Sequence, residues 1–358
     1  MKVVILGSGQ MLTNLIAGCM DSGCEIVGVF RYEKVRYPLV DRFFVDLFNP
    51  SREYTYIKSH KLYEINARSA NSAEFKKEIL KLNADIVLVG TWGEKLKKNI
   101  INLPKLATIN VHPALLPKYR GPNPYLQAIK HLETQSGVTF HLMDENFDTG
   151  AILLQKIVQI ESTDTGTELR EKIVLASREG VCELLKTLNS EIIIPIAQDE
   201  KHASYFSHIS EDDVMLDFSK SAEEISAHIR SFHPWFKCYF TYKKRFFIPN
   251  AYELEILENN SQLQSIRTPH PNHPPSFFDT QSKKAESFPQ GREGTAQNSK
   301  LPLDKTDIGT IIEKDHKHKS LTVLCGDGKL LKMNEVKLYG YINRFFTAFY
   351  IKYFVKKS

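Results

Sequence analysis

The chain has 358 residues, of which 42% are hydrophobic and 25% charged, enough apolar content for the cores of two domains. No run approaches the roughly 20 apolar residues that span a bilayer, and the first ten residues, MKVVILGSGQ, read as a strand and turn without the features of a signal peptide. A soluble, cytoplasmic protein is therefore expected. Five scattered cysteines with no CxxC spacing predict neither a disulfide framework nor a zinc site, and a net charge of +5 favours a polyanionic partner only mildly.

The chain begins with a βαβ pattern. Apolar, β-branched runs at 3–7 and 24–30 flank a stretch with helical spacing over 11–20. The Gly-Ser-Gly turn at 7–9 follows the first run, on the side where open parallel sheets bind ligands. A third glycine is missing, and Arg31 stands where a dinucleotide-binding protein has an acidic ribose anchor, so a nicotinamide oxidoreductase ranks last among the alternatives.

The segment from 31 to 52 mixes basic residues, Arg36 and Arg42 among them, with aromatic ones. A solvated face over a partly buried aromatic edge is the favoured interpretation, and contacts to phosphates and bases are the alternative. Beyond it the pattern continues to alternate between helices and strands. In chain order it predicts a helix over 72–82, capped by Asn71 or Ser72, and then strands at 84–92 and from 108. Two strands at 136–145 and 151–160 follow, and then a helix that begins at the capping box Thr165/Glu168 and ends at about Leu188.

The remainder of the chain predicts a second, smaller β domain. It contains a helix over 222–231, strand-like alternation after it, and further strands over 320–338 with a hairpin turn at 326–328. The expected fold class is α/β: a Rossmann-like, mostly parallel sheet with an OB-like C-terminal β-barrel interrupted by a disordered insert. The expected domains are a catalytic domain at 1–200, the β domain at 206–257 and 306–358, and the insert at 258–305. For the aromatic and basic tail over 344–358, docking on the protein itself is favoured over contact with a membrane or RNA.

Two polar residues lie in the strand TINVH. Asn110 and His112 are two apart, so they project to the same face at the carboxyl end of a strand that should otherwise be apolar. Either residue alone is better explained as a satisfied core group. Together with the rigid exit loop PALLP, they indicate a site, to which the turn NFDTG adds Asp148.

Three segments carry a resemblance: INVHPALLPKYRGPNP, GVTFHLMDENFDTG and IRSFHPW. They resemble the formyltransferases that use 10-formyltetrahydrofolate, and their order is most similar to the methionyl-tRNA formyltransferases. The likeness implies a folate cosubstrate, no metal, and a catalytic set of Asn110, His112 and Asp148. The implied folate-binding residues are Gly90, Trp92, Gly93, Leu115, Pro117 and Met143. The implied acceptor-binding residues are Gly9, Arg36, Arg42, Tyr119, Arg120 and Gly121.

The chemistry of formyl transfer suits these residue types. An amine that attacks a formamide carbon creates a negative oxygen, and it must lose a proton. We expect Asn110 to donate a hydrogen bond to that oxygen. His112 would donate a second one and pass a proton to the leaving nitrogen. Asp148 would orient the imidazole and raise its pKa, or accept the proton through a water.

The sequence departs from the family at two places. Ala114 stands where serine is common, which predicts the loss of a hydrogen bond that steadies the loop. The glycine-rich basic loop that the tRNA enzymes insert into the acceptor stem has no clear copy, because 31–52 is more aromatic. The expected partners are therefore initiator tRNA or, alternatively, a nucleotide-linked amino sugar. An inactive binding protein of this fold is a third hypothesis, which the intact catalytic set disfavours.

Overall fold

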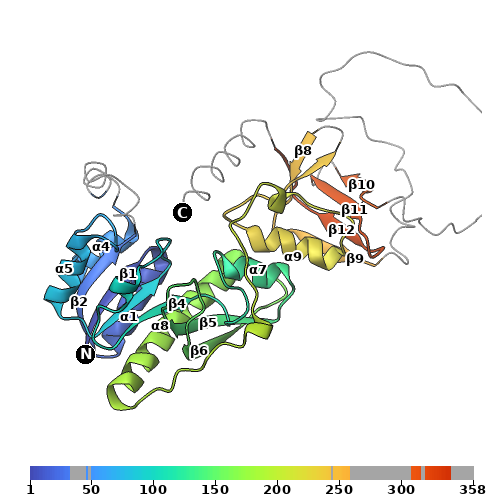
Figure 1. Cartoon of the computed structure of the whole chain (residues 1–358). Helices are drawn as coiled ribbons and strands as arrows, with labels where there is room; N and C mark the ends of the chain where they lie inside the picture. Colours follow the sequence, from blue (N-terminus) through green and yellow to red (C-terminus); the bar gives the residue numbers. More distant parts are fainter. Residues whose placement is uncertain (33–45, 47–49, 243–244, 259–307, 316–318, 340–358) are drawn as a thin grey trace, which may run out of the picture. The chain divides into compact units, whose positions relative to one another are not determined.

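The computed structural model describes residues 1–32, 46, 50–242, 245–258, 308–315 and 319–339 (Figure 1). Within these ranges the chain divides into two compact units, one up to Glu211 and the other from Asp212 onward. Several predictions lie outside the described residues. These are the roles of Arg36 and Arg42, the insert beyond Glu258, and the tail over 344–358.

A six-stranded sheet forms the centre of the first unit, in the order β2-β1-β3-β4-β5-β6. Neighbours from β2 through β4 pair in parallel, and β5 and β6 are added antiparallel. This is the mostly parallel sheet that the sequence predicts. The strands are β1 (Lys2–Gly7), β2 (Glu25–Arg31), β3 (Ile86–Gly90), β4 (Ala107–His112), β5 (Gln135–Leu142) and β6 (Ile152–Gln159).

Helices cover both faces of this sheet. On one face, Val4 and Leu6 of β1 pack with Phe75 and Ile79 of α5. On the other face α1 lies over β3 and packs against α8, so closely that a Cβ at Gly18 would collide with Val181. The helices are α1 (Gly9–Asp21), α4 (Arg52–Ser59), α5 (Ala73–Leu82), α6 (Lys98–Ile101), α7 (Pro124–Lys130), α8 (Gly166–Ser190) and the 3-10 turn η1 (Glu200–His202).

The predicted helix starts are confirmed. Ser72 accepts a hydrogen bond from Phe75 N at the start of α5, and Thr165 with Glu168 forms both halves of a capping box at the start of α8. These bonds satisfy amide groups that a helix leaves without partners at its first turn. Local sequence therefore fixes where these two helices begin.

The second unit is built of antiparallel strands in two sheets, with the orders β10-β11-β12-β9 and β13-β8-β7. The predicted helix is present as α9, capped by Ser221, and the turn at 326–328 joins β11 to β12. The elements are η2 (Asp212–Val214), α9 (Ala222–Phe232), β7 (Phe240–Tyr242), β8 (Arg245–Ile248), β9 (Leu254–Leu257), β10 (Ile311–Asp315), β11 (Ser320–Leu324), β12 (Leu330–Met333) and β13 (Lys337–Tyr339).

Candidate functional site

Asn110 and His112 lie at the carboxyl end of β4, in the middle of the sheet of the first unit. His112 is 4% exposed, and Asn110 is half-buried. The strand is flanked by β3 on one side and by β5 on the other, so both side chains lie on a rigid frame. Polar groups buried in this way need partners.

Asp148 lies against both side chains. Its Oδ1 accepts a hydrogen bond from Asn110 Nδ2 at 3.2 Å and lies 3.4 Å from His112 Nδ1. Its Oδ2 accepts from the backbone N–H of Gly121 at 2.9 Å. The three residues that the resemblance implies to be catalytic are therefore brought together, although α7 and β5 separate Asp148, in the loop from β5 to β6, from the other two in the chain.

Hydrogen bonds from Gln198 hold the backbone of the loop that carries Asp148. Gln198 donates from Nε2 to the carbonyl oxygens of Asp148 and Gly150, both at 2.8 Å. Arg120 in turn makes four hydrogen bonds, to Gln198 and to Glu200. The guanidinium of Arg120, expected to lie beside the acceptor, is thus engaged in supporting the Asp148 loop.

The backbone around Gly121 requires glycine. Its φ is +99°, and a Cβ there would collide with the carbonyl oxygen of Phe206. The preceding residue, Arg120, exchanges backbone hydrogen bonds with Ser204 and Phe206. This pairing aims the Gly121 N–H at Asp148.

The ring of His112 is fixed by its other nitrogen. Nε2 lies 2.9 Å from the carbonyl oxygen of Tyr119, which can only accept, so we assign the proton to Nε2. Tyr119 has a φ of +62°, and its ring stacks on Phe206 while its hydroxyl donates to Glu133. With Nε2 held in this way, Nδ1 faces Asp148.

The electrostatics of the pair favour an ionised Asp148 and a neutral His112. Burial opposes ionisation of Asp148, but the proximity of the His112 and His141 rings and the hydrogen bond from the Gly121 N–H outweigh it and lower its pKa to about 2. Burial lowers the pKa of His112 below its ordinary value of 6.5, although Asp148 acts in the opposite direction. The expected rise in the pKa of His112 is therefore wrong as a net effect, because the loss of hydration exceeds the attraction of the carboxylate.

His141 is a member of the site that the sequence interpretation missed. It lies on β5 directly opposite Asn110, and it is 2% exposed. Its Nε2 is 3.1 Å from Asn110 Nδ2 and 3.7 Å from Asp148 Oδ1. The signal was present in the segment GVTFHLMDENFDTG, since aligning this strand antiparallel to TINVH pairs the two residues.

The exit loop after β4 is anchored despite Ala114. Thr139 donates from its hydroxyl to Ala114 O at 2.6 Å and accepts from Leu116 N at 3.1 Å. Gln155 donates to Leu116 O at 2.9 Å, and the bond from Leu116 to Pro117 is cis. The loop that holds Leu115 and Pro117 therefore has its supports on β5 and β6.

The loop after β3 contains other predicted folate residues. Trp92 packs on Phe30 and Tyr32, with ring centroids 5.4 and 4.9 Å apart, and it shares an apolar cluster with Met143. Its Nε1 is buried and has no hydrogen-bond partner among the described residues. Gly93 approaches the hydroxyl of Tyr32 so closely that a Cβ would collide with it.

The turns at the start of α1 and the end of β3 also need glycine. Gly90 lies under Leu15 of α1 with no room for a Cβ, and Gly9 has a φ of +62°. The nearby Arg31, at the end of β2, is 2% exposed and pairs with Asp46 and Glu64 at 2.6 and 2.5 Å. Position 31 thus carries a buried, paired guanidinium and not the carboxylate that would anchor a ribose.

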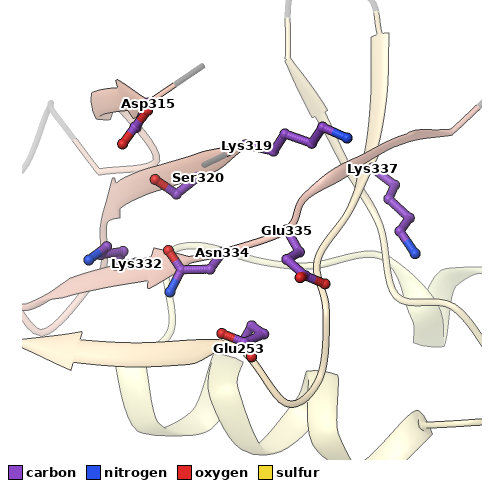
Figure 2. Close-up of a pocket in the computed structure, with 8 residues that line it drawn as sticks. All are labelled: Glu253, Asp315, Lys319, Ser320, Lys332, Asn334, Glu335 and Lys337. Carbon is purple, nitrogen blue, oxygen red and sulfur yellow. The ribbon is translucent and has the colours of Figure 1, made fainter. Parts of the chain in front are cut away.

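A pocket of about 640 Å³ lies elsewhere, in the second unit (Figure 2). Its walls carry both signs of charge, and part of that charge is neutralised locally: Lys332 pairs with Glu255, and Glu335 accepts a hydrogen bond from Asn250. None of the predicted site residues lines it. The lining residues are Glu253, Asp315, Lys319, Ser320, Lys332, Asn334, Glu335 and Lys337.

In the part of the chain that the structure describes, no helix combines the length and the apolar content needed to cross a membrane.

Comparison with known proteins agrees with this geometry. The formyl transferase model matches residues 1–185, and the formyl transferase C-terminal domain model matches 208–341. A methionyl-tRNA formyltransferase of Caldanaerobacter subterraneus subsp. tengcongensis is 30% identical over 260 residues, covering 72% of this chain and 82% of the relative. One from Thermotoga maritima is 29% identical over 232 residues, covering 65% of this chain and 72% of the relative.

Among solved structures, the N-formyltransferase from Helicobacter canadensis in complex with folinic acid and dTDP-3-aminofucose is similar in fold. Its TM-score is 0.60 at 17% identity, covering 95% of this chain and all of the other. At this identity the likeness concerns the fold. Together the two family models span most of the chain, including the strand end and loop that carry Asn110, His112 and Asp148. The chain belongs to the formyl transferase family, as a folate-dependent N-formyltransferase.

Proposed function

We propose that this protein transfers a formyl group from 10-formyltetrahydrofolate to the amino group of methionyl-tRNA, with Asn110, His112 and Asp148 as the catalytic residues. The observation that carries the chemistry is that the Asp148 carboxylate lies within 3.4 Å of both Asn110 and His112 at the end of β4. The acceptor is supported by the names of the sequence relatives and by the match of the C-terminal domain model.

In this mechanism His112 handles the proton. The ring is neutral near pH 7 because burial lowers its pKa. Its proton is on Nε2, which donates to Tyr119 O, so Nδ1 has the lone pair. When the amine adds to the formyl carbon, its proton passes to Nδ1, and the ionised Asp148 at 3.4 Å stabilises the imidazolium. The proton then goes to the leaving nitrogen of the folate as the carbon–nitrogen bond breaks.

Asn110 stabilises the oxygen that becomes negative. In the free protein one N–H of its amide is given to Asp148 and the other to His141. A negatively charged oxygen is a stronger acceptor than an imidazole nitrogen. The N–H that His141 accepts is therefore the one that transfers to the tetrahedral intermediate, while the bond to Asp148 keeps the amide in place.

The substrate contacts follow from the loops at this edge. We assign the folate to the loop with Gly90, Trp92 and Gly93, to Met143, and to the anchored Leu115 and Pro117. The acceptor side is assigned to Gly9 and to the backbone at Tyr119 and Gly121. The engagement of Arg120 with Gln198 and Glu200 favours a supporting role for it on that side.

A second acceptor remains a candidate. The Helicobacter canadensis structure, whose title names an amino sugar nucleotide, shares the fold over nearly the whole chain. The aromatic composition of 31–52 also differs from the basic loop expected of a tRNA enzyme. An amino sugar linked to a nucleotide is thus the alternative to methionyl-tRNA.

The test offers the purified protein 10-formyltetrahydrofolate with either methionyl initiator tRNA or a panel of nucleotide-linked amino sugars, and follows formylated product by mass spectrometry. We expect formyl-methionyl-tRNA, and binding of tRNA that weakens steeply as salt rises. Asn110→Ala and Asp148→Ala should each lose most turnover, about 100-fold or more, and Asn102→Ala on an exposed turn is the matched control. Formylation of sugars alone would overturn the acceptor, and near-normal rates in both site variants would overturn the mechanism.

A further inference from the structure

We infer that His141 is a positioning residue for formyl transfer, which fixes the side-chain amide of Asn110 so that its amino group faces the reacting centre. The inference rests on the proposed role of Asn110. It starts from a buried imidazole that the acid–base chemistry leaves unused, on the strand next to the catalytic one.

The hydrogen bonds define which nitrogen of His141 carries a proton. Nδ1 lies 2.8 Å from the carbonyl oxygen of Leu142, which only accepts, so Nδ1 is the donor. Nε2 of the neutral ring is then an acceptor, and it faces Asn110 Nδ2 at 3.1 Å. Proton and tautomer are thus assigned from the partners on both sides of the ring.

An asparagine amide can be placed in two ways, and only one of them suits these neighbours. If the amide were reversed, its oxygen would face the Asp148 carboxylate and the lone pair of His141 Nε2, and every pair would be two acceptors. The observed orientation gives both N–H bonds a partner. Asp148 and His141 therefore select the same orientation independently.

Of the two residues that orient the Asn110 amide, His141 is held more rigidly than Asp148. Asp148 lies in a loop, whereas His141 is held in the middle of the sheet by β4 and β6, opposite Asn110 in the register. The carbonyl that fixes its Nδ1 belongs to the next residue of its own strand. His141 thus sets the orientation of the amide in the free protein, before the substrates arrive and its N–H turns to the reacting oxygen.

The experiment compares His141→Leu with His141→Gln in the full-length protein. Glutamine can reproduce both bonds, since its oxygen accepts from Asn110 and its amino group donates to Leu142 O, whereas leucine makes neither. We expect His141→Leu to lower kcat about 100-fold with the KM for 10-formyltetrahydrofolate within about threefold of wild type, and His141→Gln to stay within about 10-fold of wild type. His60→Leu, the same change at the exposed end of α4, is the control and should leave both constants unchanged.

A purely structural role would give a different pattern. It would lower the melting temperature and the fraction of active protein without a kcat-specific loss, and glutamine would not restore turnover. A kcat of His141→Leu within threefold of wild type, or equal losses in the two variants, would overturn the inference.

One measurement does not depend on turnover. In ¹⁵N-labelled protein, the side-chain N–H signals of Asn110, assigned by their absence in Asn110→Ala, should exchange slowly with water in wild type and in His141→Gln, and at least about 10-fold faster in His141→Leu. Equal exchange in wild type and His141→Leu would refute the positioning role. A wild-type enzyme that formylates no acceptor would refute the proposed function separately, before any variant is made.

Discussion

Asp148→Asn is the substitution that examines the electrostatics of the site most directly. The carboxyl has its pKa lowered from 3.8 to about 2, and it is largely buried. A lowering of this size corresponds to about 2–3 kcal/mol of folding free energy, because each pKa unit is worth about 1.4 kcal/mol. Asparagine has nearly the same shape, but it cannot carry this charge.

The pH dependence has a definite sign. Since the pKa is lower in the folded state, the stabilisation is complete above the unfolded value of 3.8 and disappears as the pH falls through 2. We expect the wild-type protein to exceed Asp148→Asn in the free energy of unfolding by about 2–3 kcal/mol at pH 7, and by clearly less near pH 3. Turnover of the variant should fall about 100-fold or more, because the imidazolium of His112 loses its counter-charge.

Urea unfolding of both proteins, followed by tryptophan fluorescence at pH 7, 5 and 3, measures the difference in the free energy of unfolding. Formylation assays at pH 7 measure the loss of turnover. A stability difference that stays constant or widens toward pH 3 would show that the carboxylate is not stabilised by its neighbours, and the reasoning about the site would fail.

Three further predictions concern the supports of the site and its proton transfer. Thr139→Val removes the hydroxyl that binds both Ala114 O and Leu116 N, so unfolding free energy should drop by about 1–3 kcal/mol in urea titrations and the KM for folate should rise. Gly121→Ala forces a Cβ against Phe206 O at a φ of +99°, and circular dichroism melting should show a loss of at least about 1 kcal/mol together with a lower kcat. Because burial lowers the pKa of His112, kcat/KM should decline with falling pH only below about 6.5, and a decline that begins above pH 7 would contradict the neutral ring.

Much of the fold could be predicted because its signals are local. Buried strands such as β1 and β3 are short runs of branched apolar residues, and the capping residues Ser72 and Thr165 satisfy the first amides of their own helices. The mostly parallel character of the sheet followed from the alternation of strands and helices. These features depend on contacts within a few residues.

Two details of the site could not be predicted from local pattern. Ala114 suggested a loop that lacks a support, yet Thr139, 25 positions along the chain, provides it. Arg120 was expected beside the acceptor, yet Gln198 and Glu200, about 80 positions away, engage its guanidinium. In both cases the partner is set by which strands and loops become neighbours.

The sequence by itself determined the chemistry available to this protein: an amide, an imidazole and a carboxylate at the ends of elements that a parallel sheet brings to one edge. Only the tertiary structure decided how these groups are charged and aimed. Burial keeps His112 neutral against the attraction of Asp148, and the antiparallel register of β4 and β5 places His141 on the amide of Asn110. The physical reason is that dehydration and cross-strand hydrogen bonds depend on every neighbour in space, and these neighbours come from distant parts of the chain.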